Sequence, residues 1–294
     1  MKTHVQVLDC KSPAGINHWV LGAGGWNLFF HLGVMKAADE LGVAINEDDD
    51  IIGASCGSLI GAFIKNGFKW NEIAPIFIEM RNARSNPAVL AMMFNPFADP
   101  LVLMTGGFFN ARPYIQQLVD NYNLKPKKGL RILACDALRH EPVIFAGDNY
   151  DLAFALTASG AVPTMVQPLW YYEDGIPKLL VDGAAYHYNP TEFTCGTAIV
   201  SKFRKMSVFP SDLTNPVDAY FAARELYFPT VGNNRYVDDV SNIVIETGFA
   251  NVSPLNPTLS EDTCWKMIES GYNTAMPILQ KAIAEGRVTV RERN

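Results

Sequence analysis

The sequence is poor in cysteine: five of its 294 residues are cysteines, and no two of them have C-x-x-C spacing. They are odd in number and far apart along the chain, at Cys10, Cys56, Cys135, Cys195 and Cys264. This pattern indicates neither a disulfide framework nor a zinc knuckle. Unpaired thiols suit a reducing compartment, so we expect a cytoplasmic protein.

Long apolar runs are also missing. No uncharged apolar stretch of about 18 residues occurs, and the N-terminus leads into mixed residues rather than into a signal-peptide core. We expect no transmembrane helix and no signal peptide, and membrane contact only at the periphery. A surplus of positive charge is missing too. The net charge of −6 argues against a nucleic-acid partner.

Nucleotide-binding loops are incomplete. The turn Gly22-Ala23-Gly24-Gly25 begins like a phosphate loop, but Trp26, Asn27 and Leu28 follow it, so G-x-G-x-x-G is not completed. No G-x-x-x-x-G-K-[ST] occurs either. We therefore expect no nucleotide cofactor, and nothing in the sequence requires a metal ion. The turn can instead offer backbone N–H groups to an oxyanion beside a helix N-terminus.

What the chain does have is alternating short strands and helices. Hydrophobic residues make up 49% of it, enough for a sizeable core, and no linker or repeat divides it. We predict one domain over residues 1–294, with a mostly parallel α/β sheet. The predicted strands are 18–21, 51–52, 130–136, 142–145, 178–181 and 207–209. The predicted helices are 28–41, 151–158 and 260–285.

The strongest motif is Gly53-Ala54-Ser55-Cys56-Gly57, which matches G-x-S-x-G. It stands between a short apolar strand and an apolar helix. In that setting the serine lies on a tight turn with its hydroxyl exposed, and the helix N-terminus favours negative charge beside it. Ser55 is the candidate nucleophile. The alternative is a serine that only caps the helix.

A serine nucleophile needs a base, and no histidine stands in a pattern that marks one. His31 lies in an apolar helix and is expected to be a core residue. His187 follows Asp182 too closely for the usual separate loops of a Ser–Asp–His arrangement. Asp182 itself stands where an apolar strand meets a glycine turn, which is a usual place for catalytic groups. A plain Asp-Gly turn is the alternative.

Residues 70–112 are rich in methionine and phenylalanine and are interrupted by prolines. The plain interpretation is a set of short core helices. The functional one is a deformable apolar wall for acyl chains, with Met92, Met93 and Phe94 as substrate contacts.

Four blocks of the sequence resemble the patatin-like phospholipase family, in the order that the family has them. They are residues 22–37, the serine motif with Gly61-Ala62, residues 158–168 around Ser159-Gly160, and residues 181–190 beginning Val181-Asp182-Gly183. The resemblance implies a three-layer α/β/α fold and a lipid acyl hydrolase with a Ser–Asp dyad. By position, Ser55 is then the nucleophile and Asp182 its base. The N–H groups of Gly24, Gly25 and Trp26 form the oxyanion hole.

One departure concerns the substrate. The family's arginine after the glycine loop is Asn27 here, which donates hydrogen bonds without a charge. We expect Asn27 to contact substrate. The lipid class stays open, as does an activating protein partner. The alternatives are an acyltransferase or histidine-using esterase, and a lipid-binding homologue without turnover.

Overall fold

The computed structural model describes residues 16–83, 110–163, 165–194, 196–202, 241–246 and 259–291. The strands in it are β1 (His18–Leu21), β2 (Asp50–Ala54), β3 (Leu130–Asp136), β4 (Glu141–Phe145), β5 (Leu169–Glu173), β6 (Ile176–Asp182), β7 (Ala198–Lys202) and β8 (Ile243–Glu246). The helices are α1 (Leu28–Glu40), α2 (Cys56–Lys65), α3 (Trp70–Ala83), α6 (Arg112–Asn121), α7 (Leu152–Ser159) and α9 (Glu261–Ala284). Short 3₁₀ turns are η1 (Gly25–Asn27), η2 (Gly183–Ala185) and η3 (Thr191–Phe193).

Most predicted elements are present. The expected strand at 207–209 lies outside the described residues, as do Met92, Met93 and Phe94. Helix ends have the expected chemistry: the Ser260 hydroxyl accepts the Thr263 N–H at the start of α9, and Asp151 accepts the Phe154 N–H at the start of α7.

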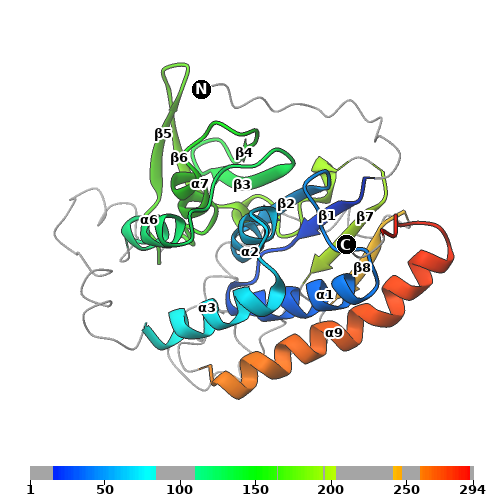
Figure 1. Ribbon diagram of the computed structural model, residues 1–294. Helices are drawn as coiled ribbons and strands as arrows, with labels where there is room; N and C mark the ends of the chain where they lie inside the picture. Colours follow the sequence, from blue (N-terminus) through cyan, green and yellow to red (C-terminus); the bar gives the residue numbers. More distant parts are fainter. Residues whose placement is uncertain are drawn as a thin grey trace, which may run out of the picture.

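The described strands form one sheet in the order β5-β6-β3-β2-β1-β7-β8, with β4 paired to β3 off this path. The pairs β1–β2, β1–β7, β2–β3 and β7–β8 are parallel. The pairs of β3 with β4 and β6, and of β5 with β6, are antiparallel. The sheet is therefore mostly parallel on one side and antiparallel on the other, with flanking helices (Figure 1).

Strands β2 and β6 share one edge of β3, end to end. Leu133 of β3 pairs with Ala54 of β2 and with β4, and Ala134 pairs with Asp182 of β6 and with β4. A strand has only two edges, and β4 occupies one of them. Ala54 and Asp182 are therefore consecutive along the other edge, opposite neighbouring residues of β3.

Two apolar clusters cover the two faces of the sheet, as strand alternation requires. Helices α1, α2, α3, α6, α7 and α9 bury their apolar residues in one cluster, together with Trp19 and Leu21 of β1. The second cluster contains Val20 of that strand. Ala184, Tyr186, Tyr188 and Phe193, from the segment after β6, pack against it.

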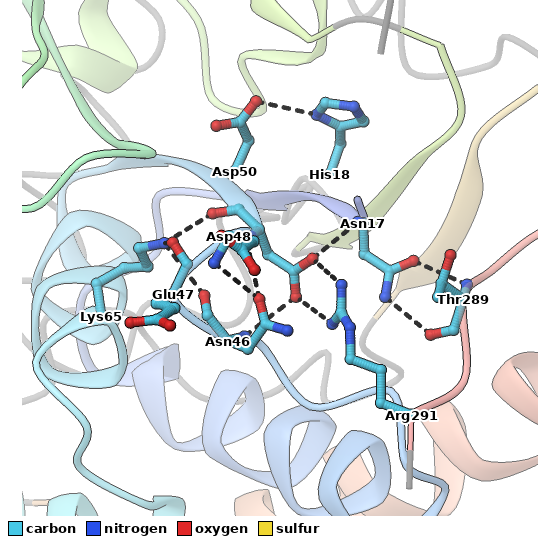
Figure 2. Close-up of polar contacts among 10 residues, drawn as sticks. Asn17, His18, Asn46, Glu47, Asp48, Asp50, Lys65, Thr289 and Arg291 are labelled. Atoms are coloured by element: carbon cyan, nitrogen blue, oxygen red, sulfur yellow. Dashed lines mark hydrogen bonds and ion pairs between the residues drawn. The ribbon is translucent and has the colours of Figure 1, made fainter. Parts of the chain in front are cut away.

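The two ends of the described chain meet at the start of β2 (Figure 2). Asp49 is fully buried and accepts two hydrogen bonds from the Arg291 guanidinium, at 2.7 and 2.6 Å. It also accepts the Asn17 N–H at 2.8 Å. The Asn17 side chain in turn exchanges two hydrogen bonds with the Thr289 backbone. These contacts hold the C-terminal residues against the sheet.

Candidate active site

Ser55 lies on a strained turn between β2 and α2. Its backbone has φ 53° and ψ −122°, a region that L-residues rarely adopt, and α2 begins at the next residue. The flanking glycines are sterically required: a Cβ at Gly57 would lie 2.0 Å from the Leu21 carbonyl oxygen, and one at Gly53 would lie 2.5 Å from the Ser58 nitrogen. The predicted strand–turn–helix geometry is present, and Ser55 is half-buried rather than enclosed.

Ser159, the last residue of α7, holds this turn in place. Its hydroxyl accepts the Ser55 N–H at 2.9 Å and donates to the Leu133 carbonyl at 2.6 Å. Because its hydrogen is thus used, the 2.8 Å contact with Ser58 must be donated by the Ser58 hydroxyl. Sequence reasoning placed Ser159 in a matching block but did not assign it this role.

Asp182 ends β6 beside the serine turn. Its side chain is buried, and its Oδ1 accepts the Ala184 N–H at 2.8 Å. Burial, and to a lesser extent the negative charge of Asp182, raises the pKa of the thiol of Cys56, the residue after Ser55. Gly183 lets the chain turn away here, because a Cβ on it would lie 2.3 Å from the Leu133 carbonyl oxygen.

The glycine loop after β1 packs against the same turn. Its first residues are anchored, with Gly22 donating to the Ser201 carbonyl at 3.0 Å and Ala23 to the Tyr188 carbonyl at 2.9 Å. The Cys56 thiol donates to the Gly22 carbonyl at 3.7 Å. The backbone of Gly24 opposes the rise in the pKa of this thiol.

Gly25 follows with φ 55°, a conformation that favours glycine. Within the described ranges its N–H has no hydrogen-bond acceptor. Residues 24–26 thus bring backbone N–H groups to the end of β1, next to the strand that leads into Ser55. Trp26 and Asn27 are buried, and the Trp26 ring stacks on Phe29 with centroids 6.4 Å apart.

His31 is fully buried and braces this loop. Its Nε2 lies 2.8 Å from the Gly22 carbonyl oxygen and its Nδ1 lies 2.7 Å from the Ser201 hydroxyl. A carbonyl oxygen only accepts, so Nε2 carries the hydrogen and Nδ1 accepts from Ser201. Burial lowers the pKa of His31 to about 4, and the ring is neutral near pH 7. The expectation of a satisfied core histidine is confirmed.

His187 is buried just beyond Asp182. Its Nδ1 accepts the Asn189 N–H at 3.2 Å, which places its hydrogen on Nε2, and burial lowers its pKa. Glu192 lies 3.6 Å from Nδ1, and burial raises the pKa of this carboxyl to about 7. Asn189 itself packs against the glycine loop, since a Cβ on Gly22 would lie 2.2 Å from its Oδ1.

Among the residues that the structure describes, no group of three or more His, Cys, Asp and Glu side chains could hold a metal ion. The helices within those same residues include none that is both long enough and apolar enough to cross a membrane.

Comparison with solved structures finds distant resemblances at 14% identity. VipD from Legionella pneumophila matches with a TM-score of 0.48, covering 92% of this chain and 68% of VipD. The type III effector ExoU gives 0.40, with 92% and 54% covered. The ExoU–SpcU complex of Pseudomonas aeruginosa gives 0.46, with 96% and 54%. This chain thus spans about half the length of the ExoU chains.

No match was found among curated proteins. A protein-family model, in contrast, matches residues 19–194, more than half of the chain. The matched segment begins in β1 and ends just beyond η3, so it includes the glycine loop, the serine turn, Ser159 and Asp182. This chain belongs to the patatin-like phospholipase family.

Proposed function

We propose that the protein is a lipid acyl hydrolase of the phospholipase A type that works through a Ser55–Asp182 dyad. One observation carries the proposal. Ala54 and Asp182 occupy consecutive positions on the same edge of β3, so the serine that follows Ala54 and the carboxylate of Asp182 converge.

The chemistry follows from these positions. As Ser55 Oγ attacks an ester carbonyl, Asp182 accepts its proton, and the N–H groups of Gly24, Gly25 and Trp26 bind the oxyanion. The alcohol or lysolipid leaves with that proton, and an acyl-enzyme remains. Asp182 then takes a proton from water, which attacks the acyl-enzyme and releases the fatty acid.

The hydrogen bonds of His31 and His187 support a dyad without histidine, because a general base needs a ring nitrogen that is free to accept a proton. His31 uses both ring nitrogens to hold Gly22 and Ser201, and His187 Nδ1 is occupied by the Asn189 N–H. Serine, base and oxyanion donors all come from this one chain, so a partner protein is not needed to complete the site. An activating partner would act on conformation or on delivery to lipid.

The first test is labelling with a fluorophosphonate probe, followed by mapping of the labelled peptide. We expect label on Ser55, no label on Ser55→Ala, and hydrolysis of a soluble short-chain ester lowered by at least about 10³-fold in that variant. A folded wild-type protein that takes no label would instead be a lipid-binding homologue without turnover.

The second test concerns the base. Asp182→Asn should lower hydrolysis by ~10²–10⁴-fold, the scale of losing a general base. Asp148→Asn, the same change in an exposed loop, is the matched control. A near-normal rate in Asp182→Asn would contradict the dyad and direct attention to His187. A panel of phospholipid, galactolipid and neutral esters, with and without an acceptor alcohol, then separates hydrolysis from acyl transfer.

A further inference from the structure

The hairpin formed by β5 and β6, Leu169–Asp182, is joined to the edge of strand β3 that carries the candidate site. Asp182 lies at its base, opposite Ala134, and the last pair between β6 and β3 is Leu180 with Asp136. The remaining half of β6 pairs with β5 alone. Figure 1 shows this hairpin projecting beyond the other described strands, on the opposite side of the molecule from α9.

Large apolar side chains are exposed on this hairpin and next to it. Trp170, Tyr172 and Ile176 are 43%, 67% and 51% exposed, and Leu138, in the turn between β3 and β4, is 54% exposed. Strand parity places Trp170 and Tyr172 on one face and Ile176 on the other. Of the six large hydrophobic side chains that are exposed in the described residues, four gather here. We call Leu138 and residues 169–179 the aromatic hairpin surface.

This surface is held rigidly. Ala137 donates to the Leu179 carbonyl at 2.8 Å, and the Arg139 guanidinium donates to the Pro177 carbonyl at 3.0 Å, which joins the two hairpins. On its inner face, the Tyr171 ring packs edge-on against Phe145, with centroids 5.8 Å apart. The exposed side chains therefore lie on a hairpin that hydrogen bonds and ring packing hold against the rest of the sheet.

The charges of the surface point to one kind of partner. The cations on this surface and next to it are paired, Lys178 with Glu173 at 2.6 Å and Arg139 with Asp136 at 2.8 Å. Asp174 and Glu141 are exposed and add negative charge. No surplus of cations is available for anionic lipid or nucleic acid. Exposed aromatic rings with nearby acidic groups instead suit quaternary ammonium groups, and Trp and Tyr are the residues that prefer a lipid–water boundary.

We propose that the aromatic hairpin surface docks on a zwitterionic membrane that presents choline headgroups, with Trp170 and Tyr172, which share one face of the hairpin, entering the headgroup layer. Because β6 of this hairpin ends at Asp182, docking here turns the Ser55–Asp182 site toward the lipid surface. The inference rests on the proposed lipid hydrolysis, and it adds the surface and the headgroup chemistry by which the protein reaches its substrate.

Binding is tested first, without turnover. Ser55→Ala protein is mixed with phosphatidylcholine vesicles and the bound fraction is measured by flotation. Adding Trp170→Ser and Tyr172→Ser should weaken the partition by roughly tenfold for each side chain, the scale of losing one buried apolar group. Trp265→Ser is the matched control, because this side chain is 41% exposed and belongs to α9, which lies on the opposite side of the molecule from the hairpin (Figure 1).

Turnover separates this inference from the proposed function. With Ser55 intact, the ratio of vesicle-lipid hydrolysis to hydrolysis of a soluble short-chain ester should be lower in the Trp170→Ser, Tyr172→Ser variant than in wild type. Wild-type protein that hydrolyses neither would contradict the proposed function, while flotation still reports on docking. Three outcomes would each overturn the docking proposal. The hairpin and Trp265 variants would bind vesicles equally, or the protein would bind phosphatidylglycerol vesicles more strongly than phosphatidylcholine vesicles. In the third, wild type would be a dimer that the hairpin substitutions convert to a monomer.

Discussion

His31 shows how one buried side chain couples the fold to the candidate oxyanion loop. Its ring joins α1, on which it lies, to Gly22 after β1 and to Ser201 in β7. Both hydrogen bonds depend on a neutral ring with its hydrogen on Nε2. A protonated ring would have a hydrogen on Nδ1 as well, and the Ser201 hydroxyl would then have to rotate away from donating to it. Protonation of His31 is therefore expected to loosen the anchor of the glycine loop.

The pH dependence of stability follows from the lowered pKa of His31. In the unfolded chain this group titrates near its ordinary value of 6.5, and in the folded protein near 4. Between these values the unfolded chain binds a proton that the folded protein does not, so the free energy of unfolding falls as the pH is lowered from 6.5 to 4. The full loss is about 3 kcal/mol.

The measurement is urea unfolding at several pH values between 7 and 4, for wild type and His31→Gln. Glutamine can donate to Gly22 and accept from Ser201 but does not titrate, so this variant should lose much of the pH dependence. Glu192, with its pKa raised to about 7, acts in the opposite direction and is common to both proteins. If the free energy of unfolding falls equally in both proteins as the pH is lowered from 7 to 4, His31 is not the group responsible for the pH dependence.

At the scale of elements, the crossing of α1 and α9 depends on two glycines. A Cβ at Gly33 would lie 2.0 Å from the Ile268 carbonyl oxygen, and one at Gly271 would lie 2.2 Å from the Phe30 carbonyl oxygen. In both cases the obstacle is backbone, which cannot rotate aside as a side chain can. The two helices thus pack in direct backbone contact, and α9 covers the helix that carries His31 (Figure 1).

We expect Gly271→Ala to lower the free energy of unfolding by about 2 kcal/mol or more. Alanine is the better helix former by about 1 kcal/mol, but overpacking costs about 1–3 kcal/mol and the fit here is worse than usual. Gly160→Ala is the control, since its φ is −102° and the nearest atom to a new Cβ is 3.5 Å away. The measurement is the urea unfolding midpoint of wild type and of both variants. A Gly271→Ala protein more stable than wild type would contradict the close packing of α1 and α9.

At the scale of the whole molecule, Asp49 joins residues near both ends of the described chain, because it accepts hydrogen bonds from Asn17 and from Arg291. Figure 2 shows Asn17, Thr289 and Arg291 side by side. Breaking a buried ion pair by removing one partner costs about 3–5 kcal/mol, because the other charge stays buried. For Arg291→Met we expect about 3 kcal/mol, the lower end, since Asp49 keeps the N–H groups of Asn17 and Asn46. The double variant with Asp49→Asn should recover part of this loss.

A double-mutant cycle by urea unfolding measures the coupling. The comparison is Lys281→Met, which removes an exposed ion pair with Glu285 at 3.8 Å and should change stability little. A loss in Arg291→Met no larger than in Lys281→Met would mean that the C-terminal residues are not fastened as described.

Local sequence determined the elements whose signals are local. The serine turn was predictable because glycine spacing, a short strand and an apolar helix all fall within a few residues of Ser55. The start of α9 was predictable because Ser260 caps it by hydrogen bonding three residues ahead. In contrast, β5, β7 and β8 were not predicted, since short apolar runs do not distinguish strand from helix. The single domain and the roles of Met92, Met93 and Phe94 stay predictions.

Tertiary structure decided what depends on pairing between distant segments. The sequence suggested Asp182 as the base. The shared edge of β3, however, arises only when β4, β2 and β6 compete for the two sides of one strand. The roles of Ser159 and His31 also depend on the tertiary structure, because the sequence does not indicate which groups a hydroxyl or an imidazole will bind. Folding brings Ser159 to Leu133 and Ser55. It brings His31 to Gly22 and Ser201. A backbone turn is fixed by its own few residues, whereas a buried polar side chain is fixed by whichever donors and acceptors the packed core leaves beside it.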